Sequence, residues 1–411
     1  MAGSTVAWPM QTTATRPWDV IIWGATGYTG RLVAEALAAD PPQGLRWALA
    51  GRDRARLERL RTALGVDAGV VVADAHDPAS LATLANSTRV VASTVGPYAR
   101  HGTPLVAACV DAGTHYADLT GEVTWMRATV DAFHDAARVS GAKIVHACGF
   151  DSVPSDLGLW WLQRHAVARH GRPCGRVVHG FGPMAGGVSG GTVASAIAMS
   201  EAAAADPQVR RALADPDLLA PGAAPEPRVR RPWWPRRDHE LGAWTAPFFM
   251  AAVNERVVRR TRALAGEPWG EGFRYRECWR ARGWFEAATI SLASVIKPAL
   301  LAFGPVSRWT ARRILPRPGQ GPSAEARARG FFRTRLVGRV DGVDAPVVVH
   351  LACDLDPGYG ATALMLREAA LSLAFDDLGD EGGVLTPAAA FGEHLVARLQ
   401  GAGLRFDVEG A

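Results

Sequence analysis

Short apolar runs alternate with stretches of helical spacing along the first third of the chain. The apolar runs are VIIW (20–23), WALA (47–50), GVVVA (69–73), RVVAST (89–94) and KIVHA (143–147). They are continuous rather than alternating, which is typical of strands buried on both faces of a parallel sheet. The stretches between them, such as GRLVAEALAA (30–39) and RARLERLRTAL (54–64), have the spacing of amphipathic helices. The repeated order of strand, helix and strand predicts an α/β fold with a doubly wound parallel sheet of the Rossmann type.

The pattern changes after residue 149. A helix is predicted at 152–170, a strand followed by a glycine-rich turn at 175–192, and a long surface loop rich in Pro and Arg at 206–238. Later stretches predict strands at 273–279, 331–340 and 346–354 and helices at 362–375 and 389–403. These elements predict an α+β second domain, with C-terminal helices that pack back on the rest of the protein. We therefore divide the chain into a flexible N-terminal tail (1–17), a Rossmann domain (18–150), a substrate domain (151–355) and C-terminal helices (356–411).

The loop GATGYTG, residues 24–30, follows the first predicted strand and opens the first predicted helix. In this context Gly24 allows a tight turn, Gly27 allows a pyrophosphate to approach the backbone, and Gly30 allows the helix to pack close to the sheet. A tight turn without a ligand is the alternative. The favoured interpretation is a dinucleotide site that uses Gly24, Ala25, Thr26, Gly27, Tyr28, Thr29 and Gly30.

The residue after the second predicted strand decides between NAD and NADP. An NAD site places Asp or Glu about 20 residues beyond the loop, to bind the ribose 2′-hydroxyl. This chain has Arg52 there, and a guanidinium can bind a 2′-phosphate that a carboxylate would repel. The neighbouring Asp53 would favour NAD instead, although it could also cap the next helix. Asp74 is placed on the adenine side, with a helix cap ahead of Pro78 as its alternative.

The loop after the fourth predicted strand should run along the cofactor toward the nicotinamide, because ligands bind at the carboxyl ends of strands. Ser93, Thr94, Gly96 and Pro97 are the residues placed there. Tyr98 and His101 follow, and both are candidates to move a proton or to anchor the loop. Farther along, Tyr116, Asp118 and Glu122 either face the site or make buried hydrogen bonds at the sheet edge.

Several other classes of protein are disfavoured. None of the five tyrosines has a lysine four residues later, which excludes the short-chain dehydrogenase mechanism, and no GxSxG elbow supports a serine hydrolase. The net charge is +5, but the sequence has no clustered basic face and no known module of the kind that nucleic-acid binding needs. The five cysteines are scattered without a CxxC pair, so we expect buried thiols in a cytoplasmic protein and no metal site. The N-terminus has no secretory signal pattern.

Two segments invite a membrane or partner interpretation. Residues 287–309 form an apolar run interrupted by Lys297 and Pro298, too short to span a bilayer, so a buried helix pair or part of an acyl-chain pocket is favoured over surface insertion. The loop RVRRPWWPRR, residues 228–237, is dense in arginine. It is interpreted as a solvated insertion, an anionic-membrane contact or a docking patch for an acidic carrier protein.

Seven motifs, in order along nearly the whole chain, resemble the saccharopine dehydrogenase-like oxidoreductases, and most of all their bacterial trans-acting enoyl reductase branch. They are GATGYTGRLVAEAL, AGRDRARLERL, VGPYARHGTPLVAACVDAGTHYADLTGE, ACGFDSVPSDLG, SGGTVAS, WTAPFFMAAVNERVVRRT and DLDPGYGATALMLREAALSLA. The resemblance implies an NADPH-dependent reductase that saturates an α,β-unsaturated acyl or polyketide intermediate carried on a synthase. It also implies that Asp151 and Ser152 pass the nicotinamide.

Reduction of an enoyl thioester requires a donor for the thioester oxygen and an acid for the α-carbon. Tyr98 is the first candidate acid, with His101 and Asp151 beside it. Backbone amides of the glycine-rich turn, at Ser189, Gly190, Gly191 and Thr192, are candidates to meet the substrate, with a plain strand-to-helix turn as the alternative. A saccharopine-type amino-acid dehydrogenase and a non-catalytic NADP-binding protein at lipid surfaces remain alternatives, and a homo-oligomer is compatible with all of them.

Overall fold

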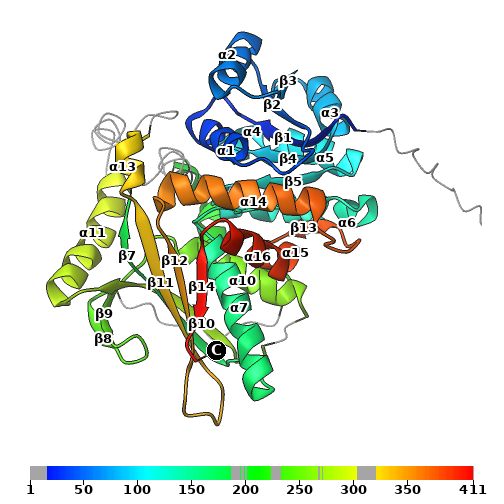
Figure 1. The fold of residues 1–411 in the computed structure, drawn as a ribbon. Helices are drawn as coiled ribbons and strands as arrows, with labels where there is room; N and C mark the ends of the chain where they lie inside the picture. Colours follow the sequence, from blue (N-terminus) through cyan, green and yellow to red (C-terminus); the bar gives the residue numbers. More distant parts are fainter. Residues whose placement is uncertain are drawn as a thin grey trace, which may run out of the picture.

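The computed structural model describes residues 16–186, 195, 199, 201–223, 233–266, 269–270, 272–302 and 321–410. Two seven-stranded sheets organise these residues, one above the other in Figure 1, with helix α14 (Thr362–Phe375) lying between them. The prediction of an α/β fold with a doubly wound parallel sheet and a second α+β part is confirmed.

The first sheet has the strand order β13-β6-β5-β4-β1-β2-β3, and every pairing in it is parallel. Its strands are β1 (Trp18–Trp23), β2 (Trp47–Gly51), β3 (Gly69–Val72), β4 (Thr88–Ser93), β5 (His115–Asp118), β6 (Lys143–Val145) and β13 (Gly383–Leu385). Its helices are α1 (Tyr28–Ala39), α2 (Arg54–Leu64), α3 (Pro78–Asn86), α4 (Tyr98–His101), α5 (Thr103–Ala112) and α6 (Val123–Ser140). The five predicted strands are all present, and the sheet also contains β5 and β13, which the sequence pattern did not predict.

Alternate residues of the central strand serve two separate cores. Val20 and Ile22 of β1 pack in the larger hydrophobic cluster, while Ile21 and Trp23 pack in the cluster on the opposite face. All four are buried. The continuous apolar run VIIW therefore reflects a strand covered on both sides, as the sequence predicts.

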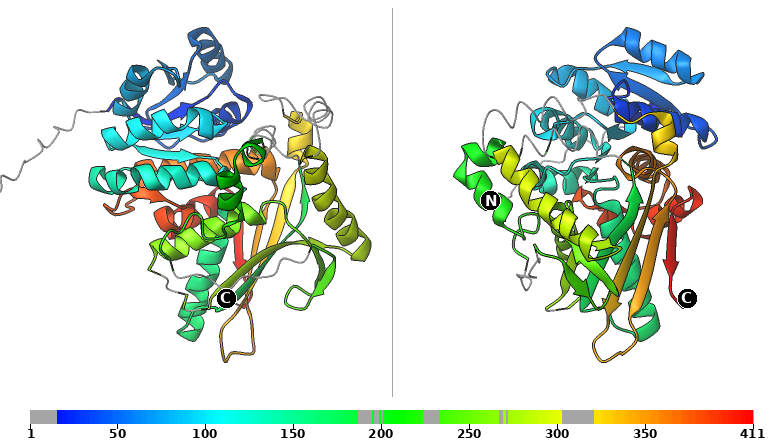
Figure 2. Two further views of the ribbon diagram at one scale, coloured as in Figure 1. Left: turned by 180° about the vertical axis from the view of Figure 1, so that it is seen from behind. Right: turned by 90° about the vertical axis from the view of Figure 1, so that its left-hand side faces the viewer.

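The second sheet is mixed and has the order β14-β12-β11-β7-β10-β9-β8. Its strands are β7 (Arg176–Ala185), β8 (Arg236–Asp238), β9 (Ala243–Ala246), β10 (Arg274–Ala281), β11 (Phe331–Arg339), β12 (Val347–Cys353) and β14 (Arg405–Val408). The accompanying helices are α7 (Val153–His170), α9 (Pro207–Ala214), α10 (Ala251–Leu264), α11 (Trp284–Ala302), α13 (Ala324–Ala328), α15 (Pro387–Phe391) and α16 (Glu393–Gly401), with the π-helix η1 (Pro357–Ala361) before α14. The views in Figure 2 show this sheet lying below the first one.

Helix α14 joins the two sheets into one hydrophobic core. It is apolar around most of its circumference, so it must be buried on all sides. Its residues Met365 and Leu366 belong to the same cluster as Ile22 of the first sheet and Leu351 of the second. The predicted C-terminal helices therefore do pack back on the first sheet, and the C-terminal region also adds β13 to the first sheet and β14 to the second.

Two predicted segments need correction, and a third is described only in part. The region 206–238, predicted as a surface loop, contains α9, whose N-cap Asp206 accepts a hydrogen bond from the Gln208 amide, and ends in β8. The first part of the apolar segment 287–309 belongs to one helix, α11, which continues through Pro298 to Ala302, and residues 303–309 lie outside the described residues. Arg16, assigned to a flexible tail, donates hydrogen bonds from its guanidinium to the Thr88 carbonyl and the Thr114 hydroxyl.

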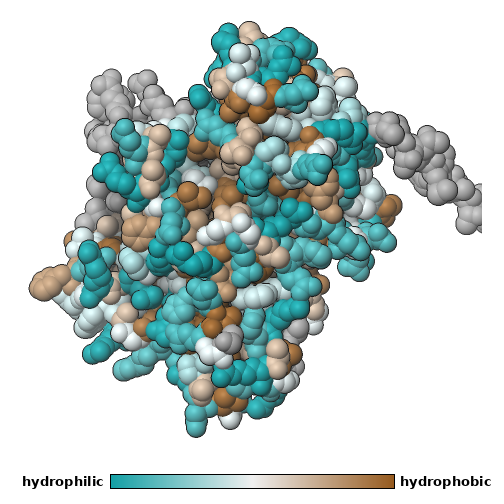
Figure 3. Space-filling model, in the orientation of Figure 1, coloured by the Kyte–Doolittle hydropathy of each residue, from teal (hydrophilic) through white to brown (hydrophobic). Residues whose placement is uncertain are grey.

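The five cysteines are buried and none is in a disulfide, which confirms the prediction of buried thiols. In the part of the chain that the structure describes, no helix is long and apolar enough to cross a membrane. On the face shown in Figure 3, hydrophobic residues appear in patches scattered among hydrophilic ones.

Candidate active site

The glycine-rich loop connects β1 to α1 at the carboxyl edge of the first sheet. Gly24 has a φ of +86°, and a Cβ there would lie 2.6 Å from Val95 Cγ2, so only glycine fits. A Cβ at Gly30 would overlap the Gly24 carbonyl oxygen and lie 2.7 Å from Thr94 Oγ1. Gly24 and Gly30 are thus required by the close approach of the helix to the sheet.

Gly27 has a different role in the loop. A Cβ there would meet only the Gly24 oxygen, at 3.2 Å, so packing alone does not require glycine. Gly27 is also the N-cap of α1, and no side chain caps that helix. The first amides of α1 are therefore free to bind an anion, and the missing Cβ lets that anion approach the backbone.

The neighbouring Tyr28 faces the second half of the chain. Its hydroxyl donates a 2.6 Å hydrogen bond to the Pro322 carbonyl and accepts one from Arg327, and its ring packs edge-on against Tyr359 at 4.7 Å between centroids. Tyr28 therefore connects the glycine-rich loop to a neighbouring segment that lies about three hundred residues later in the sequence.

Arg52 follows β2 directly and is exposed, and among the described residues it makes no ion pair. Asp53, the competing residue, caps α2 by accepting a hydrogen bond from the Arg56 amide. Asp74 does not cap α3, since Asp77 does so; its carboxylate instead accepts the His76 amide at 2.9 Å. The guanidinium of Arg52 is thus free to meet a 2′-phosphate.

Ser93 and Thr94 end β4 beside the glycine-rich loop. Ser93 is buried, and its carbonyl faces the Tyr98 hydroxyl. The Thr94 hydroxyl donates to the Trp23 carbonyl at 3.1 Å and so ties β4 to the end of β1. Gly96 is exposed and Pro97 is the N-cap of α4, which places the loop 93–97 along the carboxyl edge of the sheet.

Tyr98 is buried, and backbone groups satisfy its hydroxyl. The hydroxyl donates to the Ser93 carbonyl at 3.2 Å and accepts the Leu119 amide at 3.3 Å, and the ring stacks on Trp125. Burial raises its pKa well above the usual tyrosine value. This arrangement favours the anchoring interpretation over proton transfer.

Glu122 accepts hydrogen bonds from three donors, which its position in the sequence does not reveal. Its carboxylate accepts the Tyr98 amide at 3.0 Å, the Ala99 amide at 2.9 Å and the Ser195 hydroxyl at 2.7 Å. Glu122 is almost fully buried. It therefore holds the start of α4 and ties it to Ser195, in the segment after the predicted substrate turn. Ser189, Gly190, Gly191 and Thr192 themselves lie outside the described residues.

Tyr116 and Asp118 are fully buried in β5. Asp118 makes the buried hydrogen bonds that the alternative predicts, whereas the Tyr116 hydroxyl has no hydrogen-bond partner among the described residues. The Asp118 carboxylate lies 2.8 Å from His146 Nδ1, and His146 Nε2 lies 2.9 Å from the Thr129 hydroxyl. This chain of groups resembles a catalytic triad, but it lies in the core and Thr129 donates to the Met126 carbonyl. It joins β5, β6 and α6 and offers no nucleophile to a substrate.

Asp151 stands in the turn between β6 and α7, at the same carboxyl edge of the sheet as the glycine-rich loop. It is partly exposed, and its carboxyl has no hydrogen-bond partner among the described residues. Burial by the surrounding protein raises its pKa to about 6. An unpartnered carboxyl with a raised pKa at this edge is suited to hold and release a proton near neutral pH.

Ser152, beside Asp151, begins a buried polar chain that reaches the second sheet. Its hydroxyl donates to Asn254 Oδ1 at 3.1 Å, and Asn254 Nδ2 donates to Glu277 Oε2 at 2.9 Å. The Tyr275 hydroxyl donates to Glu277 Oε1 at 2.7 Å and lies 3.0 Å from His179 Nδ1. Burial raises the pKa of Glu277 to about 7. The chain fixes the turn that carries Asp151 to β7 and β10.

His101, a second proton-transfer candidate, is the last residue of α4. Its ring lies 5.4 Å from that of His76, which follows β3, with the planes at 81°. The positive charges of Arg100 and Arg52 also reach it. The structure therefore groups His101 with residues at the ends of β2 and β3, whereas Asp151 follows β6 on the other side of β4 in the strand order.

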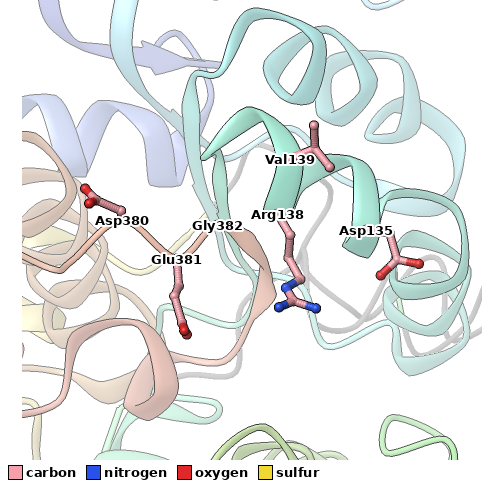
Figure 4. A pocket seen from close by; sticks show the side chains of 6 residues that line it. All are labelled: Asp135, Arg138, Val139, Asp380, Glu381 and Gly382. Atoms are coloured by element: carbon pink, nitrogen blue, oxygen red, sulfur yellow. The ribbon is translucent and has the colours of Figure 1, made fainter. Parts of the chain in front are cut away.

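A surface pocket lies away from these residues. It is lined by Asp135, Arg138, Val139, Asp380, Glu381 and Gly382. In Figure 4 Arg138 lies between Asp135 and Glu381, with α6 on one side and the loop before β13 on the other. Because β6 and β13 both begin here, the pocket is at the amino edge of the sheet, opposite to the edge where such sheets bind ligands.

Comparisons with known proteins match the geometry. Residues 20–145 match the family model of the saccharopine dehydrogenase NADP-binding domain. The saccharopine dehydrogenase (L-Glu forming) of Saccharomyces cerevisiae has a similar fold, with a TM-score of 0.50 and 13% identity over 95% of this chain and 99% of that one. Together with the glycine-rich loop, these similarities define the chain as an NADP-dependent oxidoreductase of the saccharopine dehydrogenase-like class.

Closer relatives place it more narrowly. A Mycobacterium tuberculosis protein provisionally named a trans-acting enoyl reductase is 43% identical over 96% of this chain and 98% of its own length. Proteins named trans-acting enoyl reductase from Mycobacterium bovis and Mycobacterium leprae are each 39% identical over 95% of this chain and 97% of their own lengths. The chain belongs to the trans-acting enoyl reductase family.

The residues present fit NADPH, as predicted. The uncapped start of α1 and the bare Gly27 can receive the pyrophosphate, and Arg52 is free for the 2′-phosphate. The described residues contain no group of three or more His, Cys, Asp or Glu side chains that could hold a metal ion.

Proposed function

We propose that the protein reduces α,β-unsaturated acyl groups that are bound as thioesters, on lipid or polyketide intermediates made by a synthase. Two observations support this proposal: the membership of the trans-acting enoyl reductase family, and a partly exposed carboxyl at the carboxyl edge of the NADP-binding sheet that has no hydrogen-bond partner among the described residues. That carboxyl, of Asp151, carries the proposal.

NADPH supplies a hydride when it is bound. The tasks left to the chain are to hold the cofactor, to stabilise negative charge on the thioester oxygen and to protonate the α-carbon. The glycine-rich loop and Arg52 perform the first task. The amides at 189–192 stay the predicted donors to the oxygen.

In this proposal Asp151 protonates the α-carbon. Its pKa of about 6 makes its carboxyl protonated at mildly acidic pH and a far better donor at pH 7 than an ordinary aspartate. The alternative acid, Tyr98, has its hydroxyl occupied by the Ser93 carbonyl and the Leu119 amide. The adjacent Ser152, held by Asn254, fixes the turn that presents the carboxyl.

The test is the NADPH-dependent reduction of an enoyl N-acetylcysteamine thioester by the Asp151→Asn variant. We expect kcat to fall by about 10²- to 10⁴-fold, the usual contribution of a general acid, while the Kd of NADPH stays unchanged. In the wild type, the rate should fall as pH rises through about 6, because the acid must be protonated. Asp344→Asn, at the exposed turn between β11 and β12, is the matched control.

The same assay separates this proposal from the amino-acid dehydrogenase alternative. If a secondary-amine diacid reduces NADP⁺ and enoyl thioesters are not turned over, the amino-acid dehydrogenase alternative replaces the proposed function. An unchanged kcat in Asp151→Asn would remove Asp151 as the acid and leave the substrate assignment standing.

We further propose that an acidic acyl carrier docks at Trp233, Trp234, Arg236 and Arg237. The two indoles are 67% and 50% exposed, and both arginines are exposed on β8. Large exposed aromatic residues next to arginines are typical of protein interfaces. The carrier would deliver the thioester-bound acyl chain to the enzyme from the synthase.

The double variant Arg236→Glu, Arg237→Glu tests this surface. We expect KM for a carrier-bound enoyl substrate to rise at least tenfold and to lose its dependence on salt, with no change for the N-acetylcysteamine thioester. An unchanged KM would reject the docking surface. If the wild type binds vesicles of anionic lipid, the double variant does not, and KM is unchanged, the surface is a membrane contact instead.

A further inference from the structure

The residues His76 and His101 form a pair at the edge of the NADP-binding sheet that the proposed mechanism does not use. Their rings are 5.4 Å apart and nearly perpendicular. His76 is exposed in the turn after β3, and His101 is partly buried at the end of α4. Neither histidine contacts a carboxylate side chain through its ring in any hydrogen bond within the described part of the chain.

The surroundings of this pair are predominantly cationic. The pKa of His101 is lowered first by burial and then by the positive charges of His76, Arg100 and Arg52, while Asp74 acts weakly in the opposite direction. Asp74 already accepts the His76 amide through its carboxylate. The charges of His76, Arg100 and Arg52 thus oppose a positive charge on His101, and that of Asp74 favours it. A bound anion would favour the protonated ring.

The anion that fits this place is the 2′-phosphate of NADPH. Arg52 ends β2, His76 follows β3, and β2 and β3 are neighbours in the sheet. In Rossmann folds the residue at the end of the second strand meets the 2′ position of the adenosine ribose. A phosphate at Arg52 would therefore lie next to the turn that carries His76, whose ring contacts that of His101.

We propose that His76 and His101 form, with Arg52, a proton-dependent site for the 2′-phosphate, so that NADPH binds more tightly as the pH falls through neutrality. A dianionic phosphate favours the protonated form of each histidine, so binding of NADPH takes up protons from solution. By linkage, each proton taken up strengthens binding by up to tenfold per unit of pH. NADH, which lacks the 2′-phosphate, has no such dependence. This inference rests on the NADP site and not on the acyl substrate.

The test is calorimetric titration of the full-length protein with NADPH and with NADH, from pH 8 to pH 6.5, in buffers of different ionisation enthalpy. In the wild type we expect proton uptake and a Kd for NADPH that falls at least threefold over this range, with a flat Kd for NADH. The double variant His76→Gln, His101→Gln should lose both the uptake and the slope for NADPH and keep its NADH affinity.

Two further variants complete the experiment. Arg52→Ala should weaken NADPH at every pH without affecting NADH, because it removes a fixed charge. His239→Gln, at an exposed histidine in the turn between β8 and β9, should behave as the wild type. An equal pH slope for NADPH in the double histidine variant, or proton release instead of uptake, would overturn the proposal. Neither result depends on whether enoyl thioesters are the substrate.

Discussion

The Glu122 carboxylate accepts a 2.7 Å hydrogen bond from the Ser195 hydroxyl. The two residues come from different parts of the chain: Glu122 follows β5 in the NADP-binding sheet, and Ser195 follows the glycine-rich stretch beyond β7. The same carboxylate accepts the amides of Tyr98 and Ala99. A single buried group thus couples the loop predicted to run along the cofactor to a residue that follows the turn predicted to meet the substrate.

The Glu122→Ala variant should lose stability because three donors lose their acceptor at once. Two of them are amides at the start of α4, and Tyr98, which bears one of them, is buried. We expect the free energy of unfolding to fall by about 2 to 4 kcal/mol, measured by urea denaturation. Ser195→Ala removes only one of the three bonds and should cost about 1 kcal/mol. Equal losses in the two variants would contradict this account.

A Tyr98→Phe substitution separates anchoring from catalysis. If the hydroxyl only ties the Ser93 carbonyl to the Leu119 amide, its loss lowers the free energy of unfolding by about 1 kcal/mol. The shape of the pH–rate profile and kcat should then stay close to those of the wild type. A fall in kcat of a hundredfold or more, with stability preserved, would restore Tyr98 as the acid.

Gly30→Ala should abolish tight binding of NADPH. The new Cβ would overlap the Gly24 carbonyl oxygen and crowd Thr94 Oγ1 at 2.7 Å, so the helix start must move away from the loop. We expect at least a tenfold higher Kd for NADPH, measured by quenching of protein fluorescence, and a lower melting temperature. Gly283→Ala is the control, because nothing lies within 4 Å of a Cβ at that position. Wild-type affinity in Gly30→Ala would show that the loop does not bind the cofactor.

Glu277 predicts a pH dependence of stability. Burial raises the pKa of its carboxyl to about 7 in the folded protein, from a reference of 4.5. The folded state therefore binds an extra proton between these values, and this contribution to stability is full below about pH 4 and is lost as pH rises toward 7. Relative to the wild type, Glu277→Gln should thus gain stability between pH 5 and pH 8, by up to on the order of 3 kcal/mol.

Chemical denaturation of both proteins across this range checks the Glu277 prediction. Asp156 and Asp151 also have raised pKa values, to about 7 and about 6, but they are common to both proteins and cancel in the difference. A constant difference in stability between the two proteins from pH 5 to pH 8 would show that Glu277 titrates normally.

Local features of the sequence were enough to predict the NADP-binding half. Continuous apolar runs identified the strands because a strand covered on both faces must be apolar at every position. The loop 24–30 was recognisable because the turn, the phosphate approach and the helix packing each require glycine at a set position. Arg52 could be proposed for the 2′-phosphate because its place follows from counting along one strand–helix–strand unit.

The tertiary structure alone decided which distant residues meet. The strand β13 is three residues long and joins β6 only after the chain has crossed the second sheet and returned. The contacts of Glu122 with Ser195, of His76 with His101, and of Ser152 with Asn254 depend on elements that no local periodicity relates. Side-chain spacing along one helix or strand determines which face is apolar, whereas the packing of helices such as α14 between two sheets determines what that face, and every buried polar group, will touch.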